Sequence, residues 1–102
     1  MSPDSGRNRR YAIKPSNRYA RDVRRLAKAG YDLDRLEETV EILASGERLP
    51  DRFNDHEMKG DLKGIRECHI GPDWLLMYVK DREDLVLLLL RTGTHRAVLG
   101  RE

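Results

Sequence analysis

Groups that can transfer protons or bind phosphate gather in the second half of the chain. They are three histidines, two acidic residues and one arginine: His56, Glu67, His69, Asp73, Arg91 and His95. An imidazole gives and takes protons near neutral pH, and a guanidinium can hold a phosphate through two parallel hydrogen bonds. Together, these residue types indicate a site that cleaves RNA without a metal ion.

Metal-free RNA cleavage sets three chemical requirements. A base deprotonates a 2′-hydroxyl, an acid protonates the leaving 5′-oxygen, and positive charge stabilises the phosphorane that forms between these steps. Each general acid or base typically contributes ~100- to 10,000-fold to the rate, and a preorganised charged donor gives a comparable factor. The histidines and Arg91 are sufficient for all three tasks.

Several of these residues also have a plainer interpretation. A single histidine on a strand is more often structural, and a zinc site is disfavoured because the histidines are widely separated in sequence. The turn Thr92-Gly93-Thr94 is only a weak phosphate signature. Trp74 is expected to pack in the core, with stacking on an RNA base as the alternative. Cys68 is expected to be a buried core residue, not a nucleophile.

Two amphipathic helices precede these residues. The first is predicted from an N-cap at Ser16 to a stop at Gly30, and the second from an N-cap at Asp32 to Gly46. Apolar residues recur at helical spacing in both segments: Tyr19, Val23, Leu26, Leu33, Leu36, Val40 and Leu43. The short link between the two helices predicts an antiparallel helical hairpin.

Strand-like stretches dominate the rest of the chain. Residues 49–64 show no sustained period and are predicted as a long loop that carries His56. Turn-forming residues separate the three stretches that follow, which predicts a β-meander over residues 65–70, 74–80 and 85–91. A short edge strand is expected at residues 11–13, because Pro15 ends it.

Strand geometry predicts how these residues meet. Side chains alternate across a strand, so Glu67 and His69 share one face. If the meander is antiparallel, the ends of neighbouring strands bring Arg91 and His95 near His69 and Asp73.

Length and composition favour one small domain whose N-terminal third is basic. The 102 residues contain 20 Lys and Arg against 18 Asp and Glu, but the basic residues concentrate before Gly30. On the first helix Arg21, Arg24 and Arg25 point away from the apolar stripe, which indicates either a surface for a phosphate-rich partner or a solvated helix face. Residues 1–9 are predicted to be a disordered basic leader, and residues 10–102 to form the folded domain.

The redox and membrane signals are simple. One cysteine excludes an internal disulfide and suits a reducing compartment. The sequence has no signal-peptide pattern, and its longest apolar run is too short to span a bilayer. We therefore expect a cytoplasmic protein without a membrane partner.

The motifs resemble a known pattern. They are Asp55-His56, Gly60, Lys63-Gly64, Arg66-Glu67-x-His69, Pro72-Asp73-Trp74, Tyr78 and Arg91-Thr92-Gly93-Thr94-His95. Their combined spacing resembles the YafQ branch of the RelE/ParE superfamily of bacterial toxins, over about residues 11–100. The resemblance implies a compact α+β fold in which an N-terminal helical hairpin packs on a small antiparallel β-sheet.

The resemblance also implies an activity. Such proteins are toxins of type II toxin–antitoxin pairs that enter the ribosomal A site and cleave the mRNA there. It implies that the six residues named first line the active site. His56 and His69 would then be proton-transfer candidates and His95 the candidate acid. Arg91 would bind the scissile phosphate, while the carboxylates at 67 and 73 orient or assist the histidines.

The partners and the cofactor expectation follow from the same resemblance. The partners would be a cognate antitoxin, the ribosome with its rRNA, and mRNA, and the toxin–antitoxin complex would bind operator DNA through the antitoxin. No cofactor or metal is expected. Leu99 stands where the family often has an aromatic residue, a departure that affects stacking on the substrate base.

Two other functions remain open on the same fold. One is a toxin of the ParE type that inhibits DNA gyrase, and the other is a catalytically silent relative that only binds its antitoxin. The histidines and Arg91 favour RNA cleavage, because a gyrase-binding surface needs no cluster of proton-transfer groups.

Overall fold

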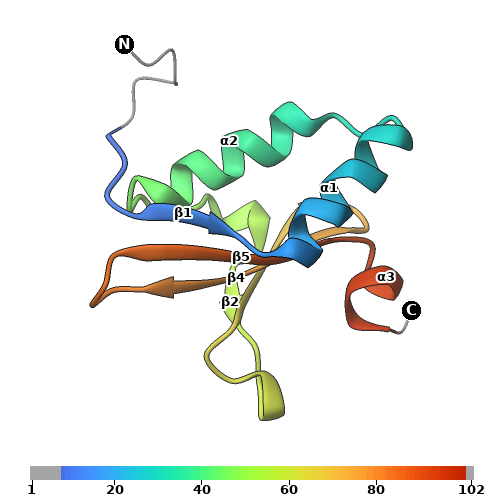
Figure 1. Ribbon diagram of the computed structural model, residues 1–102. Helices are drawn as coiled ribbons and strands as arrows, with labels where there is room; N and C mark the ends of the chain where they lie inside the picture. Colours follow the sequence, from blue (N-terminus) through green and yellow to red (C-terminus); the bar gives the residue numbers. More distant parts are fainter. Residues whose placement is uncertain (1–7, 101–102) are drawn as a thin grey trace.

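Helices and strands segregate into two layers. The computed structural model describes residues 8–100, in which α1 (Asn17–Lys28) and α2 (Leu33–Ala44) cover one face of a five-stranded sheet (Figure 1). A third helix, α3 (His95–Leu99), lies at one end of the sheet. The architecture confirms the predicted α+β class with a helical hairpin packed on the sheet. No helix within residues 8–100 combines the length and the apolar character needed to cross a membrane.

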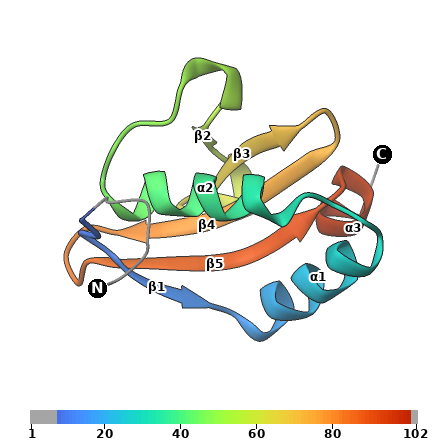
Figure 2. The same cartoon turned by 90° about the horizontal axis from the view of Figure 1, so that it is seen from above.

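The sheet is mixed, with one parallel pair. Its strands are β1 (Ala12–Pro15), β2 (His56–Glu57), β3 (Arg66–Gly71), β4 (Trp74–Asp81) and β5 (Val86–Gly93). Their spatial order is β1-β5-β4-β3-β2, and Figure 2 shows α2 lying across the sheet while α1 lies beside the end of β5. The predicted antiparallel meander is present in β3, β4 and β5, whereas β1 joins β5 in parallel. This pairing covers an edge of β5 that the meander alone would leave open.

The segment predicted as a loop has more structure than expected. It contains the 3-10 turns η1 (Asp51–Phe53) and η2 (Gly60–Leu62), and His56 lies on strand β2, not in a loop. The predicted leader at residues 1–9 lies outside the described residues, except for Asn8 and Arg9. The Arg9 guanidinium is paired with Glu41 of α2, with Nε 3.1 Å from Oε1.

Both helices begin where their caps predict. Ser16 Oγ accepts a hydrogen bond from the backbone N–H of Tyr19 at 3.0 Å and donates one to Leu90 O, so the cap also ties α1 to β5. The Asp32 carboxylate accepts from the Asp34 N–H at the start of α2. Gly30, with φ of +86°, makes the left-handed turn between the helices.

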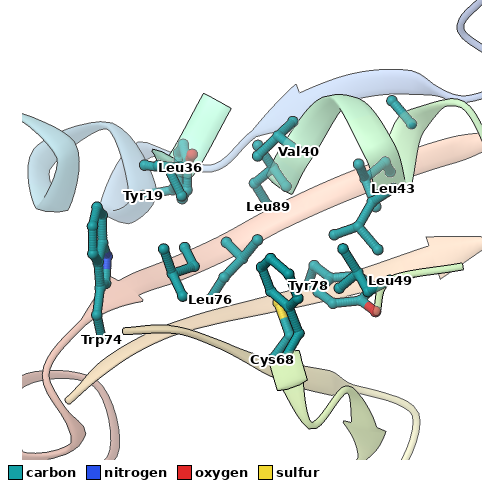
Figure 3. Packing of buried hydrophobic residues seen from close by; sticks show 14 of the residues in the cluster. Tyr19, Leu36, Val40, Leu43, Leu49, Cys68, Trp74, Leu76, Tyr78 and Leu89 are labelled. Atoms are coloured by element: carbon teal, nitrogen blue, oxygen red, sulfur yellow. The ribbon is translucent and has the colours of Figure 1, made fainter. Parts of the chain in front are cut away.

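The core lies between the helical hairpin and the sheet (Figure 3). It combines residues of α2 with every second residue of β4 and β5: Leu36, Val40, Leu43, Leu76, Tyr78, Leu87 and Leu89. Each such aliphatic side chain contributes roughly 1.5–3 kcal/mol by leaving water. Cys68 is fully buried, and burial raises the pKa of its thiol above the usual range, which confirms that it is a core residue.

Trp74 also belongs to this core. It is 4% exposed, its Nε1 donates to Thr92 Oγ1 at 3.0 Å, and its ring meets Tyr31 edge-on at 5.0 Å. The core interpretation of Trp74 is therefore confirmed. The alternative, a substrate-binding residue that stacks on an RNA base, stays a prediction, which the low exposure of the ring disfavours.

The end of β5 departs from the prediction. The strand continues through Gly93 and is followed at once by α3, whose N-cap is Thr94, with Oγ1 accepting from the Ala97 N–H at 3.1 Å. Helix α3 was not predicted, since five residues are too few to show a helical period. Gly93 has φ of +150°, and a Cβ at this position would lie 3.4 Å from Val98 Cγ2.

Gly93→Ala is expected to displace α3. The strained backbone costs roughly 1–3 kcal/mol, and the new methyl group would contact Val98. Urea unfolding should show the loss of stability, and the amide NMR shifts of α3 should change with it. Gly30→Ala is the control, because it also has positive φ but open space around its Cβ. Unchanged α3 shifts in Gly93→Ala would contradict this account.

Candidate active site

The register of four strands places the predicted site residues on one face of the sheet. Across β2, β3, β4 and β5 the directly opposite positions are His56, Glu67, Met77 and Arg91. In the adjacent row His69 lies opposite Leu75. Directly opposite side chains share a face, and this face is the one turned away from the helix-packed core. The buried side chains of Leu75 and Met77 form its apolar floor.

Three imidazoles meet on this face. The ring centroid of His69 lies 6.4 Å from that of His56 and 5.7 Å from that of His95. His56 comes from β2, His69 from β3 and His95 from the start of α3. The structure thus brings into one cluster three histidines that the sequence separates by up to 39 positions.

Asp73 fixes the orientation of His95. One carboxylate oxygen, Oδ1, lies 2.7 Å from His95 Nδ1 and accepts the His95 backbone N–H at 2.9 Å. The backbone bond, followed by the side-chain bond, lowers the pKa of Asp73, so the carboxyl is ionised at neutral pH. A carboxylate only accepts, so Nδ1 carries a proton and Nε2 is the nitrogen that can exchange one with a substrate.

His56 is paired with Glu67. Its Nδ1 lies 2.7 Å from Asn54 O, and its Nε2 lies 3.2 Å from Glu67 Oε1. Asn54 O only accepts, so Nδ1 carries the hydrogen of that bond. Glu67 is 6% exposed, and a buried carboxylate needs such a polar partner. The pair therefore places an imidazole nitrogen and a carboxylate oxygen side by side at the site.

Arg91 belongs to the same register by its backbone, but its side chain contacts α1 and α3. Its Nε donates to Asp22 Oδ2 at 2.8 Å, and its Nη2 donates to Asp22 Oδ1 at 3.2 Å and to Ala97 O at 3.3 Å. The bonds to Asp22 raise the pKa of Arg91, so the guanidinium stays charged. Two strand spacings, roughly 10 Å, separate the backbones of Arg91 and Glu67. Within residues 8–100 no hydrogen bond joins Arg91 to a histidine.

Asp22 was not predicted as part of the site. It is the single acidic residue of α1, and it falls at helical spacing between Tyr19 and Leu26 on the apolar stripe. An isolated carboxylate on the buried face of a basic helix is the signal that could have identified it, because buried charges need a partner.

The remaining predicted residues lie around this face. Arg21, Arg24 and Arg25 are exposed on α1, and Arg25 Nη1 lies 3.8 Å from Asp22 Oδ1. The basic surface of α1 therefore continues to Arg91. Leu99 is half-buried on α3, the helix that also carries His95.

A groove runs beside His69. It has a volume of about 650 Å³ and is lined by α2, by η1 and by the turn between β3 and β4. Its wall includes the guanidinium of Arg52, which lies 4.8 Å from the ring centroid of Phe53. The site is thus continuous with a depression whose walls carry basic, acidic and apolar side chains, with Asp34 and Glu38 of α2 as the acidic ones.

Three groups of the site have the chemistry of metal ligands. One ligand atom each from Glu67, His69 and His95 lies within 4.8 Å of the other two. Imidazole nitrogens and a carboxylate oxygen suit zinc or copper. The wide sequence separation of the histidines, which argued against a metal site, does not keep these groups apart in the fold.

The contact between Asp73 and His95 predicts a change in α3 at acid pH. Because folding holds the pKa of Asp73 below its ordinary value of 3.8, the contact stabilises fully above that pH and is lost as the pH falls through the lower folded value. Amide NMR shifts of α3, followed from neutral to strongly acid pH, should show this transition. Asp73→Asn has no titrating carboxyl and should lack it, so an identical transition in that variant would rule out Asp73 as its source.

Comparison with known proteins identifies close relatives. A family model described as bacterial toxin of type II toxin-antitoxin system, YafQ, matches residues 11–100. The mRNA interferase toxin YafQ of Escherichia coli K12 is 36% identical over 89 residues, which cover 86% of this chain and 95% of that protein. These matches confirm the resemblance seen in the motifs.

Solved structures agree with the sequence matches. The toxin in the E. coli DinJ-YafQ toxin-antitoxin complex superposes with a TM-score of 0.81 at 35% identity, covering 89% of this chain and 99% of that chain. A metal-bound toxin from Helicobacter pylori gives a TM-score of 0.81 at 38% identity, with 86% and 98% covered. The shared fold therefore extends over nearly the whole length of each relative.

Proposed function

Because the chain belongs to the family of YafQ toxins of type II toxin–antitoxin systems, we propose that it is an endoribonuclease that cleaves mRNA in the ribosomal A site without a metal ion. The observation that carries this proposal is the cluster of three imidazoles, two of which are paired with carboxylates. The curated relative from E. coli is named an mRNA interferase toxin, which supports RNA as the substrate.

The acid step falls to His95 in this proposal. Asp73 holds its Nδ1–H, so the imidazolium presents Nε2–H to the leaving 5′-oxygen and returns to the neutral form as the P–O5′ bond breaks. The same carboxylate stabilises the charged ring and fixes its rotamer.

The base step falls to the other two histidines. His69, between His56 and His95, or His56 with Glu67 receives the 2′-hydroxyl proton while the 2′-oxygen bonds to phosphorus. The products are a 2′,3′-cyclic phosphate and a free 5′-hydroxyl. One proton leaves the 2′-oxygen and one proton is added to the 5′-oxygen, so the reaction consumes no net proton.

Arg91 supplies the positive charge. Its Nη1 can donate to a nonbridging phosphate oxygen, and the apolar floor of Leu75 and Met77 strengthens such an interaction by excluding water. A ribosome that holds the mRNA would set the attacking and leaving oxygens in line.

The two alternatives make different use of this face. Inhibition of DNA gyrase on the same fold requires a binding surface, but no carboxylate that orients an imidazole. A catalytically silent relative would bind its antitoxin and leave mRNA intact. The Asp73 and His95 pair, with its 2.7 Å contact, favours catalysis over both.

His95→Ala and Arg91→Ala are expected to abolish cleavage. Loss of a general acid costs roughly 100- to 10,000-fold, and loss of a charged donor roughly 100- to 1,000-fold. Primer extension on mRNA from a translation reaction should show cuts within the A-site codon for the wild-type chain, but not for His95→Ala or Arg91→Ala. Arg82→Ala, an exposed arginine at the other end of β5, is the matched control. Intact mRNA together with failed DNA supercoiling would favour the gyrase alternative.

The proposed partners follow from the family. E. coli YafQ is found in a complex with DinJ, and we extend this to a cognate antitoxin that covers the basic groove or the His95 region. Through that antitoxin the complex would bind operator DNA. With the ribosome and mRNA as its partners, the protein would act in the cytoplasm.

Reversing the charge of Arg21, Arg24 and Arg25 to Glu is expected to weaken ribosome association. These exposed side chains on α1 would neutralise rRNA phosphates, so the loss should be largest at low salt. Sedimentation with ribosomes over a salt series measures it. The control is an equal charge change at Lys14, Arg48 and Arg82, which are exposed elsewhere. Equal sedimentation of the two triple variants would contradict a specific role for α1.

A further inference from the structure

A buried carboxylate that the proposed reaction does not use lies directly behind the phosphate-binding arginine. We infer that Asp22 is a positioning residue, which fixes the Arg91 guanidinium so that Nη1 is the nitrogen offered to the substrate phosphate. The inference rests on the proposed function, since it assigns Asp22 a part in the same reaction.

The contacts of Asp22 restrain both the side chain and the strand that carries it. Its two oxygens accept from Arg91 Nε at 2.8 Å and from Arg91 Nη2 at 3.2 Å. Oδ2 also accepts a hydrogen bond from the Thr92 backbone N–H at 3.1 Å. Thr92 lies past the residues of β5 that pair with β1. One carboxylate therefore holds the guanidinium plane and the backbone of the next residue at once.

The geometry leaves one nitrogen of Arg91 for a ligand. Asp22 occupies the edge formed by Nε and Nη2, and Ala97 O takes a further hydrogen bond from Nη2. Among the described residues, no hydrogen bond reaches Nη1. The side chain of Arg91 is 16% exposed, so part of it reaches the surface. Because the two-pronged pair with Asp22 already fixes the guanidinium, it has less rotamer freedom to lose when a phosphate binds.

Charge balance is compatible with phosphate binding. Asp22 neutralises one positive charge, but Arg25 Nη1 lies 3.8 Å from its Oδ1. The group of Asp22, Arg25 and Arg91 thus keeps a net positive charge. The Asp22 carboxylate therefore orients Arg91, while the local electrostatic potential stays positive and still attracts an anion.

Asp22→Asn tests the role of this carboxylate. The amide is isosteric and can still accept the Thr92 N–H, but it lacks the charge and the second acceptor that hold Arg91. A misplaced group costs up to about 100-fold in rate, so we expect kcat for mRNA cleavage to fall by about 10- to 100-fold with little change in KM. Val40→Ala is the control, because Val40 is a buried core residue of α2 whose truncation lowers stability without removing a polar contact.

A double-variant cycle separates positioning from general destabilisation. Lysine cannot form the two-pronged pair with Asp22, so in the Arg91→Lys background we expect Asp22→Asn to cost less than about 2-fold further. An equal loss in both backgrounds, or an equal loss in Val40→Ala, would show a merely structural role and overturn the inference.

A spectroscopic readout makes the test independent of turnover. In the wild-type chain the Nε–H of Arg91 should give a protected NMR signal, which Asp22→Asn should lose while the core amide signals remain. Wild-type rates in Asp22→Asn, or faster cleavage, would overturn the positioning role and leave the proposed function standing. A wild-type chain that does not cleave mRNA would overturn the proposed function itself.

Discussion

Strand register is the constraint on which the whole candidate site depends. Because β2, β3, β4 and β5 pair with His56, Glu67, Met77 and Arg91 opposite one another, polar groups share the face away from the core. A slip of one residue in β3 would exchange the two faces. His69 and Glu67 would enter the hydrophobic core, and Cys68 would reach the surface. The packing of alternate residues against α1 and α2 therefore holds the chemistry in place.

Pairs of opposite charge organise that face. Asp73 orients His95, Glu67 lies against His56, and a buried carboxylate on α1 holds Arg91. In each pair a carboxylate restrains a side chain that can act on a substrate. Preorganisation of this kind lowers the cost of placing charge at a transition state. The pairs come from different elements, so the fold as a whole sets their geometry.

Local patterns predicted most of the fold but not its ends. The helical hairpin and the meander were predictable because Ser16, Asp32 and Gly30 act within a few residues of the helices that they begin or end. The parallel pairing of β1 with β5 was not, because it joins segments more than 70 positions apart. Helix α3 was not predictable, because its five residues are too few to show a helical period.

The sequence by itself determined which residue types could serve a ribonuclease, and its motif spacing identified the family. Only the tertiary structure decided which of them meet. It put Trp74 in the core and added Asp22 beside Arg91. It also brought the three imidazoles into one cluster, with the Arg91 guanidinium held separately by Asp22. The reason is physical: periodicity and capping act over a few residues, whereas register and burial are settled by cooperative packing of the whole chain.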